Sequence, residues 1–223
     1  MASTGTGNQL GRARRGLGTA ALTALWLLVW TIAVTYDLRA GWLLSSLGRY
    51  VRYPIDPTVA ALFPQPLPDD PAAIEDLVDA RLPYARDIEV WGVPWYFATP
   101  RQALSQGRGD CEAYAMVLAS LLAAKGITYR VRASFSHMWV EYAGRPESPG
   151  ESAAEAVLVN VDGAYRFRMP ALLELGHHLR EQKWLHWDGL APLRQALLLA
   201  GWPVILICVP RARRRSRNGS PTA

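Results

Sequence analysis

The chain has 223 residues, of which 50% are hydrophobic and nine are tryptophan, and its formal net charge is +5. This length fits one domain with additional segments, and the hydrophobic content is high for a plain soluble domain. The two cysteines, Cys111 and Cys208, are too few for a disulfide framework. No Cys-x-x-Cys or His-Glu-x-x-His spacing is present, so we predict neither a metal site nor another cofactor.

A run of 20 residues without a charge, 17–36, is long enough to cross the hydrocarbon layer of a membrane as a helix. The three arginines before it would also suit the leading region of a cleaved signal peptide. Against that alternative, the run is longer than a signal-peptide core, and residues 33–37 contain no small-x-small cleavage site. We therefore predict a basic tail over 1–16 and a transmembrane helix over 17–36.

Residues 37–70 are expected to form a stalk or interfacial helix and then an extended linker, because the second half of this segment is rich in proline. The folded domain is expected to span residues 71–189. Asp70 and Pro71 are typical of a helix start, and Pro83 ends that helix. The aromatic residues that follow either fill the core or line a substrate cleft: Tyr84, Trp91, Trp95, Tyr96 and Phe97.

A helix with Cys111 in its first turn is the central element of the predicted domain. Apolar residues recur at spacings of three and four after a glycine-rich turn, Asp110 can cap the helix start, and Gly126 can end it. Unpaired backbone N–H groups and the positive end of the helix dipole favour a thiolate at such a position. We therefore expect a lowered pKa for the Cys111 thiol.

Two strands are predicted downstream of this helix. Residues 134–142 alternate so that His137, Trp139 and Glu141 share one face. Residues 156–163 form a second extended run, which carries Asp162 at its end. The polar segment between them, 143–155, is expected to be a loop without a site.

The second candidate transmembrane helix spans residues 190–209, with Arg194 near one end and Pro203 as a kink, and the alternative is a buried C-terminal helix. A basic tail, 210–223, follows. All 19 acidic residues lie between the two basic tails. By the positive-inside rule both tails are cytoplasmic, and the domain lies on the far side of the cell (inner) membrane. The basic excess is therefore a topology signal, and we predict no nucleic-acid partner.

Between residues 87 and 142 the chain resembles the core of the transglutaminase-like superfamily, above all its bacterial members, which include cysteine proteases. Among the motifs that carry this resemblance are Trp91-Gly92-Val93-Pro94, Gly109-Asp110-Cys111-Glu112 and His137-Met138-Trp139-Val140-Glu141. The similarity is strong from residue 91 to residue 162, about a third of the chain. It implies an α+β, papain-like core in which a cysteine-bearing helix packs on an antiparallel sheet, here flanked by the two transmembrane helices.

The resemblance also implies the roles of three residues. Cys111 would be the nucleophile, His137 the general base and acid, and Asp162 the orienting carboxylate, with Asn160 on the same strand face as the substitute. Bacterial relatives often carry an acidic residue where this chain has Ala113, which weakens any inference about metal binding or regulation at that position.

These observations predict a membrane-anchored enzyme that forms a thioester with a peptide or carboxamide and passes the acyl group to water or an amine. Backbone N–H groups at the helix start, with a side chain from residues 91–106, would stabilise the oxyanion. The expected partners are the lipid bilayer and a protein or peptide substrate, with the cell envelope as a candidate source. The alternative is a membrane-tethered module that binds a cell-envelope polymer or a partner protein without chemistry.

Overall fold

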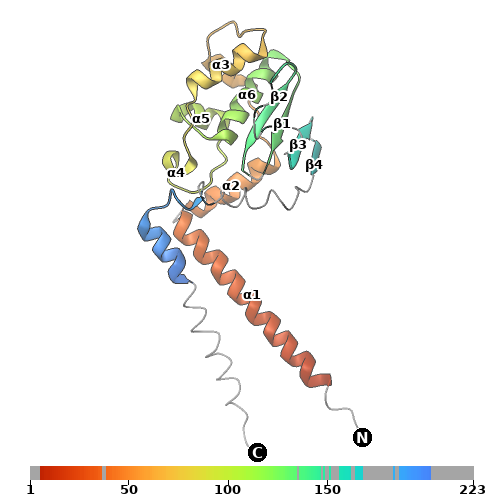
Figure 1. The fold of residues 1–223 in the computed structure, drawn as a ribbon, viewed down its shortest axis with the longest axis vertical. Helices are drawn as coiled ribbons and strands as arrows, with labels where there is room; N and C mark the ends of the chain where they lie inside the picture. The colour runs from red at the N-terminus through yellow and green to blue at the C-terminus, as the bar shows by residue number, and fades with distance from the viewer. Residues whose placement is uncertain are drawn as a thin grey trace, which may run out of the picture. The chain divides into compact units, whose positions relative to one another are not determined.

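The computed structural model describes residues 6–36, 39–134, 136–146, 148, 151, 156–161, 164–167, 183 and 186–201. The chain divides into two compact units. The first comprises Met1–Ala40 and Ala191–Ala223, and the second comprises Gly41–Leu190. Figure 1 shows the ribbon with its helices and strands.

The first unit pairs α1, Thr6–Tyr36, with a helix of residues 192–201. The indole N–H of Trp30 donates a hydrogen bond to the carbonyl of Leu197 at 2.9 Å, and Arg194 donates to the carbonyl of Thr35 at 3.4 Å. A Cβ atom at Gly201 would lie 2.5 Å from the Trp30 ring, so this glycine permits close helix packing.

Among the described helices, none has on its own both the length and the apolar character that a membrane span requires. The helices Ala21–Tyr36 and Ala40–Val51 meet this requirement only when they are taken together as a bent pair.

Helices make up most of the second unit, and α6 lies at its centre. The bounds of α6 match the prediction, because the Asp110 carboxylate accepts a hydrogen bond from the N–H of Ala113 at 3.0 Å and Gly126 ends the helix with φ of 72°. Most of its side chains between Ala113 and Leu122 are buried. The helices of this unit are α2 (Ala40–Val51), η2 (Pro57–Leu62), α3 (Pro71–Arg81), α4 (Asp87–Val90), α5 (Pro100–Gln106) and α6 (Cys111–Lys125).

The strands form one antiparallel sheet in the order β2-β1-β3-β4. Helix α6 contacts β1 and β2, so the predicted α+β class is confirmed. Ala133 of β1 lies opposite both Met138 of β2 and Leu158 of β3, which places these three residues in one row at one end of the sheet. The strands are β1 (Tyr129–Ala133), β2 (Met138–Tyr142), β3 (Leu158–Val161) and β4 (Ala164–Phe167).

The strand bounds differ from the prediction in three places. Of the strand predicted over 156–163, the described part is a strand only from Leu158 to Val161. Strand β1 was not predicted, although Arg130 and Arg132 alternate with apolar residues along it. The strand predicted over 134–142 begins only at Met138, because the N–H of Ser134 bonds the carbonyl of His137 at 2.8 Å and closes a turn. His137 therefore directly precedes a strand instead of lying within one.

From Gly41 onward, the segment between α1 and α3 is part of the second compact unit. The Ser46 hydroxyl accepts a hydrogen bond from the N–H of Phe97 at 3.0 Å, and the Ser120 hydroxyl of α6 accepts one from the N–H of Asp56 at 3.0 Å. Pro57 begins η2 next to the capping Asp56, so this proline starts a helix and does not extend a linker. The stalk and linker expected over 37–70 thus include residues that pack into the domain. Helix α3 begins at Pro71 with Asp70 as its cap, as predicted.

Candidate functional site

The start of α6 and the start of β2 meet at one end of the sheet. Cys111 is the first residue of α6, and it receives a hydrogen bond from the backbone of Met138, the first residue of β2. His137 directly precedes Met138, and its charge acts on Asp110, the residue before Cys111. The structure therefore brings the predicted nucleophile and the predicted general base to the same edge of the domain.

The electrostatic environment of the thiol is the opposite of the one we predicted. Burial raises the pKa of the Cys111 thiol well above its ordinary value, and the carboxylates of Asp110 and then Glu112 raise it further. The hydrogen bond from Met138 acts the other way and does not compensate. A helix dipole typically contributes only ~0.3–1 kcal/mol, which desolvation and two neighbouring charges exceed. The expected lowering of this pKa is therefore wrong, and the resting sulfur is a thiol.

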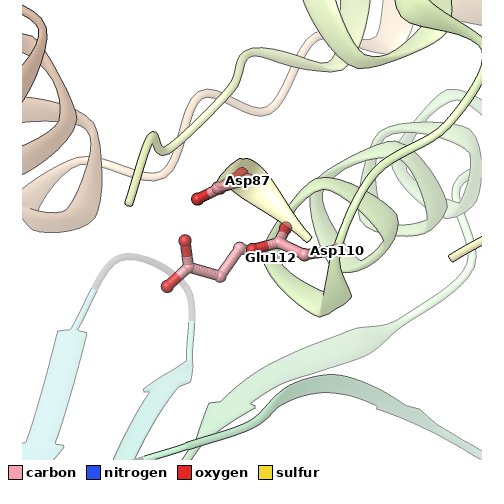
Figure 2. A group of neighbouring side chains, drawn as sticks. All are labelled: Asp87, Asp110 and Glu112. Atoms are coloured by element: carbon pink, nitrogen blue, oxygen red, sulfur yellow. The ribbon is translucent and has the colours of Figure 1, made fainter. Parts of the chain in front are cut away.

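Three carboxylates converge at the start of α6, and Figure 2 shows them: Asp87 from α4, and Asp110 and Glu112, the two sequence neighbours of Cys111. One oxygen of each lies within 4.8 Å of the others. Asp87 is buried and accepts a hydrogen bond from the N–H of Tyr96 at 2.6 Å. Both oxygens of Glu112 accept from the indole N–H of Trp95, at 2.9 and 3.1 Å.

The position of these carboxylates raises the pKa of all three. Burial raises the pKa of Asp110 to about 6. Burial and then the Asp110 charge raise the pKa values of Asp87 and Glu112 well above their ordinary range. Like charges this close disfavour full ionisation, so the cluster retains protons near neutral pH. Carboxylate oxygens are also the ligands of Ca²⁺ and Mg²⁺, so these are the described residues that could hold a metal ion. No spacing motif in the sequence joins Asp87 to the other two.

Glu151 holds the imidazole of His137. The Nε2 atom of His137 lies 2.9 Å from Oε1 of Glu151, and the other Glu151 oxygen accepts a hydrogen bond from Arg145 at 2.7 Å. Arg145 is held in turn by Glu75 of α3 at 2.9 Å, and Tyr142 donates to the same Glu75 carboxylate. An ion-paired chain thus leads from α3 to the imidazole.

This pairing assigns the tautomer of His137. Burial opposes ionisation of Glu151, but hydrogen bonds from Arg145 and then His137 outweigh it and hold the pKa of that carboxyl below its ordinary value. An ionised carboxylate only accepts hydrogen bonds, so we assign the imidazole proton to Nε2. Nδ1 is then the nitrogen that can accept a proton. Glu151 lies in the loop that we expected to carry no site, and its residue type alone gave no signal.

Asp162 lies outside the described residues. Strands β2 and β3 both run antiparallel to β1, so both begin at the end of the sheet where Cys111 lies. Val161, the last described residue before Asp162, is three positions beyond Leu158, roughly 10 Å along the strand at ~3.3 Å per residue. The described part of β3 therefore leads away from His137.

Asn160, the predicted substitute, lies opposite Val131 and Tyr165 in the sheet. It lines a cavity of about 530 Å³ together with Tyr53 and Tyr165.

Some of the predicted oxyanion donors already donate hydrogen bonds to carboxylates of the site. The Asp110 carboxylate accepts hydrogen bonds from the N–H groups of Ala113 and Glu112, and Trp95, from the expected region 91–106, donates to Glu112. In the aromatic stretch Tyr96 and Phe97 are buried in the core, Trp91 and Trp95 are half-buried, and Tyr84 is exposed. Partial burial and then the charges of Cys111 and Asp110 raise the pKa of Tyr84 to about 12. An exposed aromatic ring therefore lies near the thiol.

Comparison with protein-family models and with curated proteins finds no match to this chain. The resemblance to the transglutaminase-like superfamily thus depends on the motif residues themselves, and the function has to be argued from the site.

Proposed function

We propose that the chain is a membrane-anchored thiol enzyme with a papain-like, transglutaminase-like core, which cleaves or transfers the acyl group of a peptide or carboxamide through a thioester on Cys111. One observation carries the proposal. Cys111 contacts the backbone of the residue next to His137, and His137 is held through Nε2 by an ionised carboxylate, which leaves Nδ1 as a base.

The chemistry begins from a protonated sulfur, because the thiol pKa is raised. His137 Nδ1 takes the thiol proton as the sulfur attacks the carbonyl carbon and the C–S bond forms. When the tetrahedral intermediate collapses, the C–N bond breaks and the imidazolium gives its proton to the leaving amine. Water or a second amine then attacks the thioester carbonyl and gives a proton to His137, so that a C–O or C–N bond forms. The C–S bond breaks as the acyl product leaves, and the imidazolium returns the proton to the sulfur, which restores the thiol.

Glu151 fills the orienting role in this proposal, since it faces the imidazole and is itself held by Arg145. Asp162 is the residue that the family resemblance implies for the same role. The two assignments make different predictions for the variants Glu151→Gln and Asp162→Asn.

The test is acyl transfer to Cys111 from a p-nitrophenyl ester of a short acylated peptide, followed by the intact mass of the full chain in detergent. The unaltered protein should form a hydroxylamine-sensitive adduct, Cys111→Ala should form none, and His137→Ala should form it at least tenfold more slowly because the base is lost. Cys208→Ala is the control for the other thiol.

Within the same assay, Glu151→Gln should slow the adduct by about tenfold, the equivalent of one lost charge-assisted hydrogen bond, while Asp162→Asn changes it little. The reverse order would assign the orienting role to Asp162. An adduct that forms equally fast without His137, or no adduct in the unaltered protein, would contradict the enzyme.

A second candidate is a membrane-tethered module that binds a cell-envelope polymer or partner protein without chemistry. The raised pKa of the Cys111 thiol favours it, because a catalytic cysteine is normally activated by a lowered pKa. Failure of the adduct assay in a folded protein would support this candidate.

The proposed location follows from the sequence. Two spans over 17–36 and 190–209, with arginine-rich tails outside them, would place both termini in the cytoplasm and the domain on the outer side of the cell (inner) membrane. The substrate is then a protein or peptide that reaches this side, such as one of the cell envelope.

A further inference from the structure

Helix α2 is amphipathic, but its polar side faces the protein. Ser46 is fully buried and bonds the N–H of Phe97. Arg49 donates hydrogen bonds to the carbonyl of Phe97 at 2.8 Å, to the side chain of Gln102 at 3.0 Å and to the hydroxyl of Tyr96 at 3.1 Å. The only charged residue of this helix is therefore directed into the domain.

The opposite side of α2 is apolar and exposed. Leu44 is 72% exposed, Leu47 48% and Val51 66%, and their spacing of three and four places them in one stripe along the helix. We name these three residues the α2 face. A surface helix normally has the reverse arrangement, with its apolar stripe toward the core. Single exposed leucines are ordinary, but an uncharged apolar stripe along one helix marks an interaction site.

We propose that the α2 face inserts into the boundary between lipid headgroups and acyl chains of the membrane. The proposal rests on the proposed function in one respect, namely that the run 17–36 crosses the membrane. Helix α1 ends at Tyr36 and α2 begins at Ala40. Four Cα–Cα steps span at most about 14 Å, so the first turn of α2 cannot lie far from the membrane surface.

The charges at the ends of α2 suit this partner. Arg39 directly precedes the helix and Arg52 directly follows it, and both are exposed. An apolar stripe bordered by arginine is the usual composition of a helix that lies in the interface of a membrane with anionic lipids. Docking of this kind holds the second unit at the bilayer and limits its substrates to molecules within reach of the membrane surface.

The test places nitroxide labels on the full chain in vesicles of phosphatidylethanolamine and phosphatidylglycerol. The labelled variants are Leu44→Cys and Leu47→Cys, in a chain that also carries Cys111→Ala and Cys208→Ala. Leu62→Cys is the matched control, because Leu62 of η2 is 49% exposed against 48% for Leu47. Spin relaxation by oxygen, which concentrates in lipid, is compared with relaxation by a water-soluble nickel chelate.

Labels at 44 and 47 should be relaxed more by oxygen than by nickel, and the label at 62 more by nickel than by oxygen. Equal nickel access at all three sites would overturn the proposal, and so would spin–spin broadening that disappears on dilution with unlabelled chain, since that indicates a second copy on the α2 face. Extraction of the vesicles with alkaline carbonate separates two claims, namely that the run 17–36 anchors the protein in the membrane and that the α2 face docks on it. Release of the protein would overturn the anchoring and the docking together, whereas retention with water-exposed labels would overturn the docking alone.

Discussion

Asp110 acts on Cys111 in two ways, through its position as a helix cap and through its charge. Its carboxylate caps α6 and so fixes where the helix, and with it the thiol, begins. Its charge also raises the pKa of the thiol, after the larger effect of burial. Because burial raises the pKa of Asp110 only to about 6, this carboxyl is ionised at the alkaline pH where a thiol titrates.

Asp110→Asn should separate these effects, because asparagine caps helices as well as aspartate does and carries no charge. The thiol pKa should fall by about one unit, as expected for the loss of one neighbouring charge. The measurement is the pH dependence of iodoacetamide alkylation of Cys111 in a Cys208→Ala chain. Asp70→Asn is the control, since Asp70 caps α3 in the same manner but is absent from the charges that act on the thiol. An unchanged alkylation profile for Asp110→Asn would contradict the role of this charge.

At the scale of secondary structure, the sequence predicts the elements whose ends depend on local chemistry. The caps Asp70 and Asp110 and the left-handed Gly126 are local features, and α3 and α6 lie where they were expected. The order of the strands depends on long-range pairing. Neither the insertion of β1 between β2 and β3 nor the return of Glu151 to His137 has a local signature. The thiol pKa was predicted wrongly for a related reason, since burial, the largest cause of its rise, comes from tertiary packing.

The packing of helix α2 could not be predicted from the sequence either, because its composition fits both a stalk and a packed helix. Ser46→Ala distinguishes them. The substitution leaves the buried N–H of Phe97 without its acceptor, and the free energy of unfolding should fall by about 1–3 kcal/mol. Ser45→Ala, one residue earlier, should have little effect, because Ser45 only bonds the carbonyl of Trp42 within the same helix. Urea unfolding of the full chain in detergent is the measurement, and equal stability of the two variants would favour the stalk.

For the whole molecule, the acidic cluster and the series of ion pairs that leads to His137 change the stability with pH in opposite directions. Glu151 has a lowered pKa, so its contribution is present above its unfolded pKa and is lost as the pH falls. Asp110 has a raised pKa, so its contribution is present below its unfolded pKa and is lost as the pH rises through about 6. The stability maximum should therefore lie on the acid side of neutrality, between the pH ranges in which the two groups titrate.

The free energy of unfolding should accordingly decrease between pH 5 and pH 8. The shift of Asp110 from 3.8 to about 6 corresponds to about 3 kcal/mol at ~1.4 kcal/mol per pKa unit, of which about 1.4 kcal/mol is lost between pH 5 and pH 8 and the rest at lower pH. Urea unfolding of the full chain in detergent at the two pH values measures the decrease. Asp110→Asn should be the more stable protein at pH 8 and should show a smaller decrease, whereas Asp70→Asn should follow the unaltered chain. Equal stability of the unaltered protein at both pH values would mean that the cluster is open to water and does not impose the charge repulsion that keeps the thiol protonated.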